Sequence, residues 1–184
     1  MATQTTTGVR TLSQAEKLLA RVHIRLMVEP DLQGLEWGGE FAHFRKLYAD
    51  AYQRYLHGLS VLWVAELPET GIIGQVFIQL CCDRPELADG LRKAYLYSFR
   101  IKPAYRSLGV GSRILEVVEA DLRRRGFKIV TLNVAKDNPD AQRLYRRRGY
   151  HVVAHEAGVW SYPDQFGVWH QVEEPAWRME KEIG

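Results

Sequence analysis

Cysteine is scarce in this sequence. Its 184 residues include only two, Cys81 and Cys82, and they are adjacent in a segment with strand character. Neighbouring side chains of a strand face opposite ways, so a disulfide between these two is not expected. There is also no second cysteine pair that could complete a zinc site. The sequence therefore predicts no bound metal.

Long apolar runs and a strong charge imbalance are absent too. No stretch is long enough to span a bilayer, and the chain does not start with the basic and then apolar pattern of a signal peptide. We therefore expect a cytoplasmic protein without a membrane partner. The net charge is only +3, and the arginines gather near expected helix ends rather than in one basic tract. This pattern argues against nucleic-acid binding but suits anionic ligands.

The composition is that of an ordinary globular protein, with 46% hydrophobic and 26% charged residues. A chain of 184 residues is long enough for one good core and short for two. The first ten residues are rich in threonine and lack periodicity, so we expect a disordered tail at residues 1–10. A single domain is expected to follow over residues 11–184, because we find no repeat and no internal linker.

Two hydrophobic periodicities divide the rest of the chain. Apolar residues at three- and four-residue steps predict helices, and these lie at residues 13–19, 31–37, 40–57, 110–125 and 139–148. Alternating apolar residues predict strands, and these lie at residues 22–28, 61–67, 72–82, 94–101, 129–134, 151–154 and 177–183, with a further hairpin over residues 159–169. The strand, helix, strand series over residues 94–134 predicts a parallel pair of strands across the helix.

A strand followed by a bare loop stands at the centre of this pattern. Tyr95, Tyr97, Phe99 and Ile101 alternate with smaller or polar residues, which is strand spacing. Pro103 ends the strand. Val110 then starts an apolar helical stripe, so the loop between strand and stripe leads directly into a helix start.

The loop leaves its backbone uncovered at Gly109 and Gly111. At a helix start, free N–H groups and the positive end of the helix dipole point the same way, which makes a preformed anion site. Arg106 and Arg113 add positive charge. We expect this loop to bind a pyrophosphate.

Other glycine-rich loops fit less well. A dinucleotide fingerprint needs a third glycine where this chain has Ile114, and a nucleoside-triphosphate loop needs a Gly-Lys-Ser/Thr sequence that does not follow. Taken alone, the glycines could also serve only a tight turn.

Two motifs together resemble the GCN5-related N-acetyltransferase (GNAT) family. The first is Arg106-x-x-Gly109-x-Gly111 after an apolar strand and a proline, and the second is Asn138-x-x-Ala141-x-x-Leu144-Tyr145-x-x-x-Gly149-Tyr150. The resemblance covers residues 99–150 by motif and the flanking segments by their order of elements. It implies a mixed α+β fold, with a central, mostly antiparallel sheet of six to seven strands, a parallel pair at the acyl-CoA site and about four flanking helices.

The resemblance also implies a reaction and a set of site residues. Acetyl-CoA would donate its acetyl group to a primary amine of a small molecule or peptide, which attacks the thioester directly. Tyr145 would be the catalytic acid that protonates the leaving thiolate, and the backbone N–H near Ile101 would bind the thioester carbonyl. The residues implied in acetyl-CoA binding are Phe99, Arg100, Ile101, Arg106, Ser107, Leu108, Gly109, Val110, Gly111, Ser112, Asn138 and Tyr145.

The residue that serves as general base in one subgroup of the family is absent from this sequence. The ribosomal-protein N-terminal acetyltransferases carry a Leu-Glu-Val-Arg strand, whereas the matching stretch here is Leu132-Asn133-Val134-Ala135. A water chain to solvent could replace the base. The side chains that could act as a base elsewhere in the chain are Glu29, Glu36, His170, Glu173 and Glu174.

Two further alternatives stay open from the sequence. A non-catalytic sensor could keep the acyl-CoA pocket, although a pure binder needs no acid at Tyr145. The hairpin from Trp160 to Trp169 carries more apolar area than an exposed hairpin normally does. We expect it to border the acceptor cleft, and the alternative is a contact in a homodimer.

Overall fold

A seven-stranded sheet organises residues 12–184, the part of the chain that the computed structural model describes. The tail expected at residues 1–10 lies outside these described residues. The strands of the main sheet are β1 (His23–Leu26), β2 (Ser60–Leu67), β3 (Gly71–Gln79), β4 (Lys93–Ile101), β5 (Ile129–Ala135), β6 (His151–Glu156) and β9 (Ala176–Glu182). A separate hairpin is formed by β7 (Val159–Pro163) and β8 (Trp169–Glu173).

Four α-helices and three 3-10 segments accompany these strands in the described residues. The α-helices are α1 (Gln14–Leu19), α2 (Arg45–Leu56), α3 (Val110–Arg124) and α4 (Pro139–Arg147). The 3-10 segments are η1 (Glu29–Gly39), η2 (Ala42–Phe44) and η3 (Pro103–Tyr105).

The strand order is β1-β2-β3-β4-β5-β9-β6, and every neighbouring pair is antiparallel except β4 and β5. This confirms the expected fold, including its single parallel pair. The last strand differs from a simple closing strand, because β9 lies inside the sheet and pairs with β5 on one side and β6 on the other. The end of the chain is thereby tied to the strand that forms one wall of the site.

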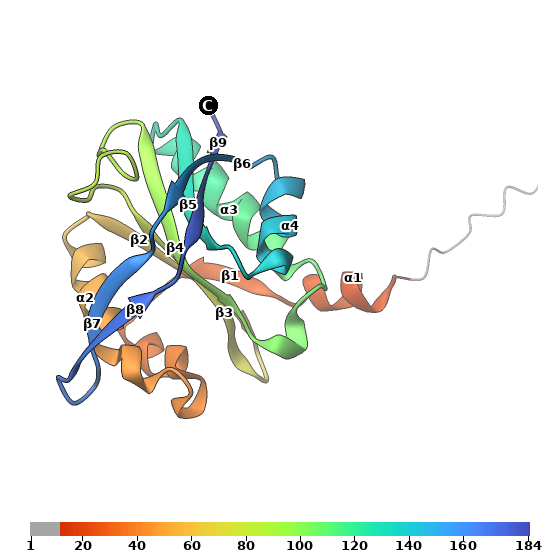
Figure 1. Cartoon of the computed structure of the whole chain (residues 1–184). Helices are drawn as coiled ribbons and strands as arrows, with labels where there is room; N and C mark the ends of the chain where they lie inside the picture. Colours follow the sequence, from red (N-terminus) through yellow and green to blue (C-terminus); the bar gives the residue numbers. More distant parts are fainter. Residues whose placement is uncertain (1–11) are drawn as a thin grey trace, which may run out of the picture.

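Helices cover both faces of the sheet (Figure 1), and each face carries its own hydrophobic cluster. The apolar stripe of α3, with Ile114, Leu115 and Leu122, is fully buried against one face. On the other face, α2 and η1 pack Tyr48 and Leu35 over β2 and β3. Burying each such side chain stabilises the fold by about 1.5–3 kcal/mol. The strands between the two layers are therefore apolar on both sides.

The helix expected over residues 40–57 is shorter in the structure. It begins at Arg45, and residues 42–44 form the separate segment η2. Gly38 and Gly39 adopt positive φ angles of 73° and 107°, and the Phe41 N–H donates to the Glu36 carbonyl. This reversal turns the chain sharply before the helix begins. It directs the rings of Phe41 and Phe44 toward the sheet.

Two general features of residues 12–184 complete the description. None of their helices has the length and apolarity that crossing a membrane requires. Within the same residues, no group of three or more His, Cys, Asp or Glu side chains is arranged to hold a metal ion.

Candidate active site

A cleft opens where the two parallel strands separate. β4 and β5 pair from Lys93 and Ile129 as far as Leu96 and Leu132, and beyond that point they diverge. The opening has a volume of about 790 Å³. It is lined by β4, the loop before α3, the last residues of β5, one face of α4, and Trp37 and Phe41 from the opposite layer. Because the cleft passes between the strands, it connects the two faces of the sheet.

A bulge in β4 decides which side chains face which layer. Gln75 pairs with Arg100 and Phe77 pairs with Tyr97, so Ser98 and Phe99 together lie opposite a single residue of β3. Ser98 takes up the extra residue with a positive φ of 49°. The alternation expected through Tyr95, Tyr97, Phe99 and Ile101 is therefore broken.

Because of the bulge, alternate side chains before and after Ser98 point to opposite faces of the sheet. Tyr97 packs against the cluster under α2, whereas Phe99 and Ile101 pack against the cluster under α3. Arg100 consequently takes the place on the α2 side that simple alternation would give to Phe99. Its guanidinium lies over the rings of Phe41 and Phe44, at 4.3 Å and 4.8 Å from their centroids.

The start of α3 has the features of an anion site. The N-cap residue is Gly109, with a positive φ of 89°; no side chain caps the helix, and its first turn has no acidic residue. Arg106 ties the loop to the end of β4, because its Nε donates to the Ile101 carbonyl at 2.8 Å. The backbone N–H groups of the first turn are therefore presented to the cleft by a loop that is fixed at both ends.

The second wall of the cleft is α4. Asn138 caps this helix, with its Oδ1 accepting from the Ala141 N–H at 3.1 Å, and Pro139 occupies the first turn. Capping uses only the side-chain oxygen of Asn138, so the N–H groups of its side-chain amide remain available to a ligand. The cap fixes the helix that positions Tyr145 in the cleft wall.

Tyr145 is buried in this wall, with 6% of its surface exposed. Its ring packs on Phe99 at 6.4 Å and on Tyr150 at 5.7 Å. Its hydroxyl has no hydrogen-bond partner among the described residues. Burial raises the pKa of Tyr145 above the ordinary value of 10.0, so the phenol keeps its proton at neutral pH.

Most of the side chains that could act as a general base either are bonded to another side chain or lie away from the cleft. Glu36 accepts two hydrogen bonds from Arg45, at 2.6 Å and 2.9 Å, and these bonds hold the pKa of Glu36 below its usual value. The Nε2 of His170 lies 2.9 Å from a carboxylate oxygen of Asp164.

Glu29 and Glu173 do not line the cleft, but Glu174, at the junction of β8 and β9, does. Among the described residues Glu174 has no ion-pair partner, and Asp140, the other carboxylate in the cleft wall, pairs with Arg143.

The structure gathers the sequence-predicted site residues around the cleft with two exceptions. Val110 is buried in the core and Leu108 lies outside the lining, so only their backbone could contribute. Trp37 and Phe41, from η1 and the turn that follows it, also line the cleft, although neither was named individually as a site residue from the sequence. Their helical spacing resembled that of core residues. Only the paired glycines that follow Trp37 hinted at the reversal that brings them to the site.

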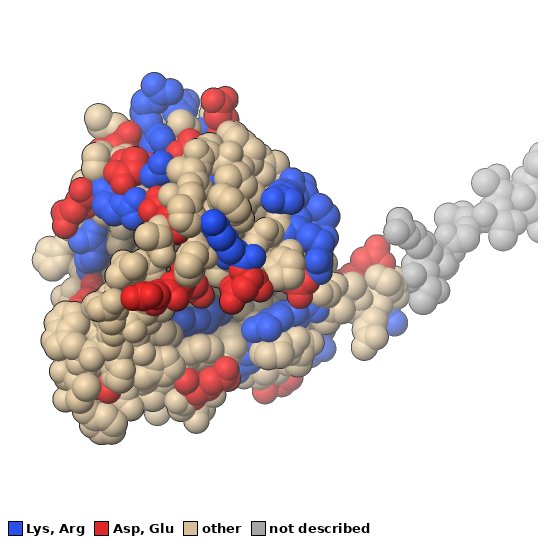
Figure 2. All heavy atoms as spheres, in the orientation of Figure 1, with Lys and Arg blue, Asp and Glu red and all other residues tan. Residues whose placement is uncertain are grey.

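The hairpin of β7 and β8 lies beside α2 and η2, away from the main sheet (Figure 1). Trp160 and Tyr162 pack on the Phe44 ring, at 6.2 Å and 4.9 Å between centroids. None of the residues from Trp160 to Trp169 lines the cleft. The hairpin therefore packs behind Phe44 and does not border the cleft as expected from the sequence, and its outer surface is largely uncharged (Figure 2).

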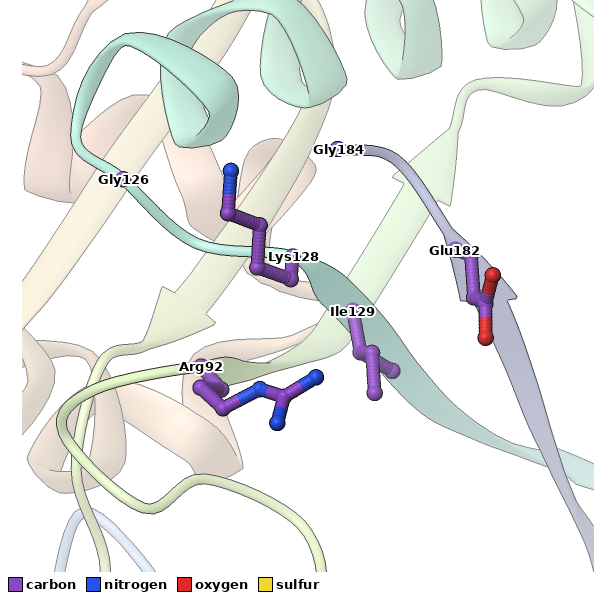
Figure 3. Close-up of a pocket in the computed structure, with 6 residues that line it drawn as sticks. All are labelled: Arg92, Gly126, Lys128, Ile129, Glu182 and Gly184. Carbon is purple, nitrogen blue, oxygen red and sulfur yellow. The ribbon is translucent and has the colours of Figure 1, made fainter.

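A second depression, of about 350 Å³, lies at the other end of the parallel pair (Figure 3). Arg92, Lys128 and Glu182 are among the six residues that surround it. It adjoins the amino-terminal ends of β4 and β5, where the strands are still paired and no uncapped helix start points into it. Among residues 12–184, the uncapped start of α3 and Tyr145 belong to the larger cleft and not to this depression.

The comparisons with known proteins agree with this geometry. The sequence model described as the acetyltransferase (GNAT) family matches residues 29–150. An uncharacterized N-acetyltransferase of Bacillus subtilis (strain 168), YycN, is 27% identical over 89 residues, which cover 48% of this chain and 54% of that protein. The alignment thus spans only about half of that relative.

Solved structures share the fold. One is Arabidopsis thaliana NAA60 in complex with acetyl-CoA, with a TM-score of 0.66 at 20% identity over 88% of this chain and 98% of that one. Another is spermidine N-acetyltransferase from Vibrio cholerae in complex with CoA and spermine, with a TM-score of 0.63 at 17% identity over 89% and 96%. At these identities they establish the architecture and not the acceptor. Together with the family match over both motifs, they show that the chain belongs to the GCN5-related N-acetyltransferase (GNAT) family.

Proposed function

We propose that this protein transfers the acetyl group of acetyl-CoA to a primary amine by direct attack on the thioester. The observation that carries the proposal is that one cleft joins the uncapped start of α3 to the buried Tyr145 hydroxyl. The first feature suits a pyrophosphate, and the second suits protonation of a thiolate. The cleft also continues to the opposite face of the sheet, where an acceptor can enter without displacing the donor.

The donor would be held by the loop and the two helices. The backbone N–H groups at Gly109, Gly111 and Ser112 would bind the pyrophosphate, and Arg106 and Arg147 in the cleft wall add positive charge. Lys and Arg side chains gather over α4 on the surface beside the cleft (Figure 2). A polyanionic cofactor is attracted to such a surface.

The thioester would lie between the separated strands. The edge of β4 from Phe99 to Ile101 lines the cleft and offers backbone groups to the pantetheine arm. A backbone N–H near Ile101 would bind the carbonyl oxygen as it gains charge, which accelerates acyl transfer. β4 pairs with β5 only as far as Leu96, so on that edge the backbone groups of residues 99–101 are not used by the sheet.

The single experiment that tests this function is release of free CoA from acetyl-CoA in the presence of a panel of amines. We expect thiol release that depends on the amine and yields the N-acetylated product. Tight binding of acetyl-CoA without any turnover would instead support a sensor on the same fold.

We further propose Glu174 as the base that helps remove a proton from the acceptor ammonium. Glu174→Gln should lower kcat/KM at pH 7 by at least about tenfold, since a positioned base is worth ~10²–10⁴-fold. The deficit should shrink as the pH approaches the acceptor's own pKa, about 10.4 for an alkyl amine, because the amine then ionises unaided. The measurement is a pH profile of kcat/KM for both proteins.

Glu173→Gln is the matched control, because this neighbouring carboxylate does not line the cleft. It should leave the profile unchanged. Equal profiles for Glu174→Gln and the native protein would mean that water carries the proton instead.

The β7–β8 hairpin should affect the acceptor and not the donor. Shortening the turn at residues 163–167 should change acceptor KM several-fold, because Trp160 and Tyr162 would no longer hold the Phe44 ring in place. Acetyl-CoA affinity, measured by calorimetry, should stay the same, since the loop before α3 is not touched. A shortened variant that only became monomeric from a dimer, with unchanged kinetics, would identify the hairpin as a subunit contact.

A further inference from the structure

Arg100 is a cation without a carboxylate partner among the described residues, and it lines the cleft. This is unusual for a half-buried arginine, since buried charges are normally paired. The other arginines near this layer are occupied: Arg45 pairs with Glu36, and Arg54 donates to the Cys81 carbonyl. A charge left unpaired inside a binding cleft is available to a ligand.

The guanidinium is held in one orientation by three neutral groups. Its Nη1 donates to the Tyr48 hydroxyl at 2.5 Å, and the rings of Phe41 and Phe44 stack close to it. Burial raises the pKa of Tyr48, so this hydroxyl stays neutral and does not offset the arginine's charge. Because Tyr48 takes one donor and the rings take none, the remaining N–H donors of Arg100 are left for another acceptor.

A second unused donor belongs to the same wall. The indole Nε1 of Trp37 is buried and has no hydrogen-bond partner among the described residues. Trp37 lines the cleft, and its ring meets Phe41 edge-on at 5.0 Å between centroids. Its backbone is in the left-handed region, with φ 49° and ψ 48°, a conformation that non-glycine residues rarely adopt. A strained backbone together with a buried donor that lacks a partner is typical of a functional residue.

We propose that Arg100, together with the Trp37 indole, binds a carboxylate of the acceptor, so that the natural acceptors are amines that also carry a carboxylate, such as free amino acids. The inference rests on the proposed acetyl transfer. Two donors on one wall suit an acceptor-only group with two oxygens, and the unpaired Glu174 elsewhere in the cleft suits the ammonium. A polyamine carries only positive charges and would be repelled by the unpaired charge of Arg100.

The experiment compares matched acceptors on matched variants. The panel contains the standard amino acids, each paired with its C-terminal primary amide, and spermidine. The variants are Arg100→Met, which keeps an apolar stem between the two rings, and Arg100→Lys, which keeps the charge without the planar donors. Arg124→Met is the control, because it removes one charge at the far end of α3. Amino acids and amides differ in amine pKa, so the quantity measured is the ratio of variant to native kcat/KM for each acceptor, in which that difference cancels.

We expect the native protein to prefer amino acids over their amides. Arg100→Met should raise KM for amino acids at least about tenfold, the effect of losing a hydrogen-bonded charge pair, while the values for the amides stay within about twofold. Arg100→Lys should recover part of the loss, and Arg124→Met should behave like the native protein. Equal losses for amino acids and amides, or a native preference for spermidine, would overturn the inference.

Binding separates this inference from the proposed function. Calorimetric titration of the same amino acids and amides into the protein–CoA complex requires no turnover. If the native protein acetylates none of the amines, the proposed function fails. The titration then still decides about Arg100: binding of amino acids that Arg100→Met abolishes supports the carboxylate site, and its absence in the native complex rejects it.

Discussion

Replacing Tyr145 with phenylalanine should reduce the turnover number at least about a hundredfold while leaving acetyl-CoA binding almost unchanged. The variant keeps the ring that packs on Phe99 and Tyr150, and removes only the hydroxyl. A positioned general acid is typically worth ~10²–10⁴-fold in rate. Its hydroxyl could contribute at most about one hydrogen bond to the bound cofactor, ~1 kcal/mol. The measurements are the rate of CoA release and the calorimetric affinity for acetyl-CoA.

The pH dependence of this step follows from the raised pKa of Tyr145. The acid acts in its protonated form, so its loss of a proton should lower activity only at a pH above the ordinary tyrosine value of about 10. Activity should therefore show no falling limb from this group between pH 6 and about 9. A descending limb in that range that disappears in Tyr145→Phe would contradict the buried, protonated state.

Tyr150→Phe supplies the matched control for the same chemical change. The hydroxyl of Tyr150 donates to the buried Glu119 carboxylate at 3.1 Å, and Tyr150 does not line the cleft. This variant should lose about 1 kcal/mol or more of folding stability, because it leaves a buried acceptor with one partner fewer, yet keep its turnover number. If Tyr145→Phe behaved in the same way, with lower stability and normal turnover, Tyr145 would be a packing residue and water would protonate the thiolate.

Replacing Gly111 with valine should remove most of the affinity for acetyl-CoA, which is the largest expected loss of binding. A Cβ atom at this position would lie 3.1 Å from Cδ1 of Ile101 and 3.2 Å from Cδ2 of Leu144, closer than ordinary contact. Both of these residues line the cleft. The sequence alone suggests that the bulk would block the approach of a pyrophosphate to the backbone, but the structure directs the new side chain between β4 and α4. The expected effect is that Ile101 and Leu144 are pushed into the cofactor's space.

Calorimetry with Gly111→Ala and Gly111→Val measures this effect as a series. Alanine adds one atom against the flexible ends of two side chains, so a moderate loss is expected, and valine adds two more methyl groups. Overpacking of this kind costs about 1–3 kcal/mol of stability, so thermal unfolding should be recorded for each variant to show that the folded state is populated. Acetyl-CoA bound normally by folded Gly111→Val would mean that this loop does not hold the cofactor.

The sequence by itself determined the order of the elements and the two walls of the cleft. Local signals sufficed there: the Ser13 capping box starts α1, Asn138 and Pro139 start α4, and bare glycines precede the stripe of α3. Each depends on residues three or four positions apart, so no tertiary contact is needed to read it. The resemblance of the two motifs to the GNAT family then implied that Tyr145 lies at the donor site with the loop before α3.

Tertiary structure decided the side of the cleft that we propose for the acceptor. The bulge at Ser98 exchanges the faces of Phe99 and Arg100, and no local signal in β4 marks the extra residue. The reversal at Gly38 and Gly39 brings the Phe41 ring into contact with the Arg100 guanidinium. Phe41 and Arg100 are far apart in the chain. Glu174 became distinguishable from Glu173 only when the path of the chain from β8 into β9 placed Glu174 in the cleft wall and left Glu173 outside it. All three depend on how distant segments of the chain pack together, which local spacing does not encode. For the bulge, the face of a strand side chain depends on its register with a distant partner, and one inserted residue reverses it.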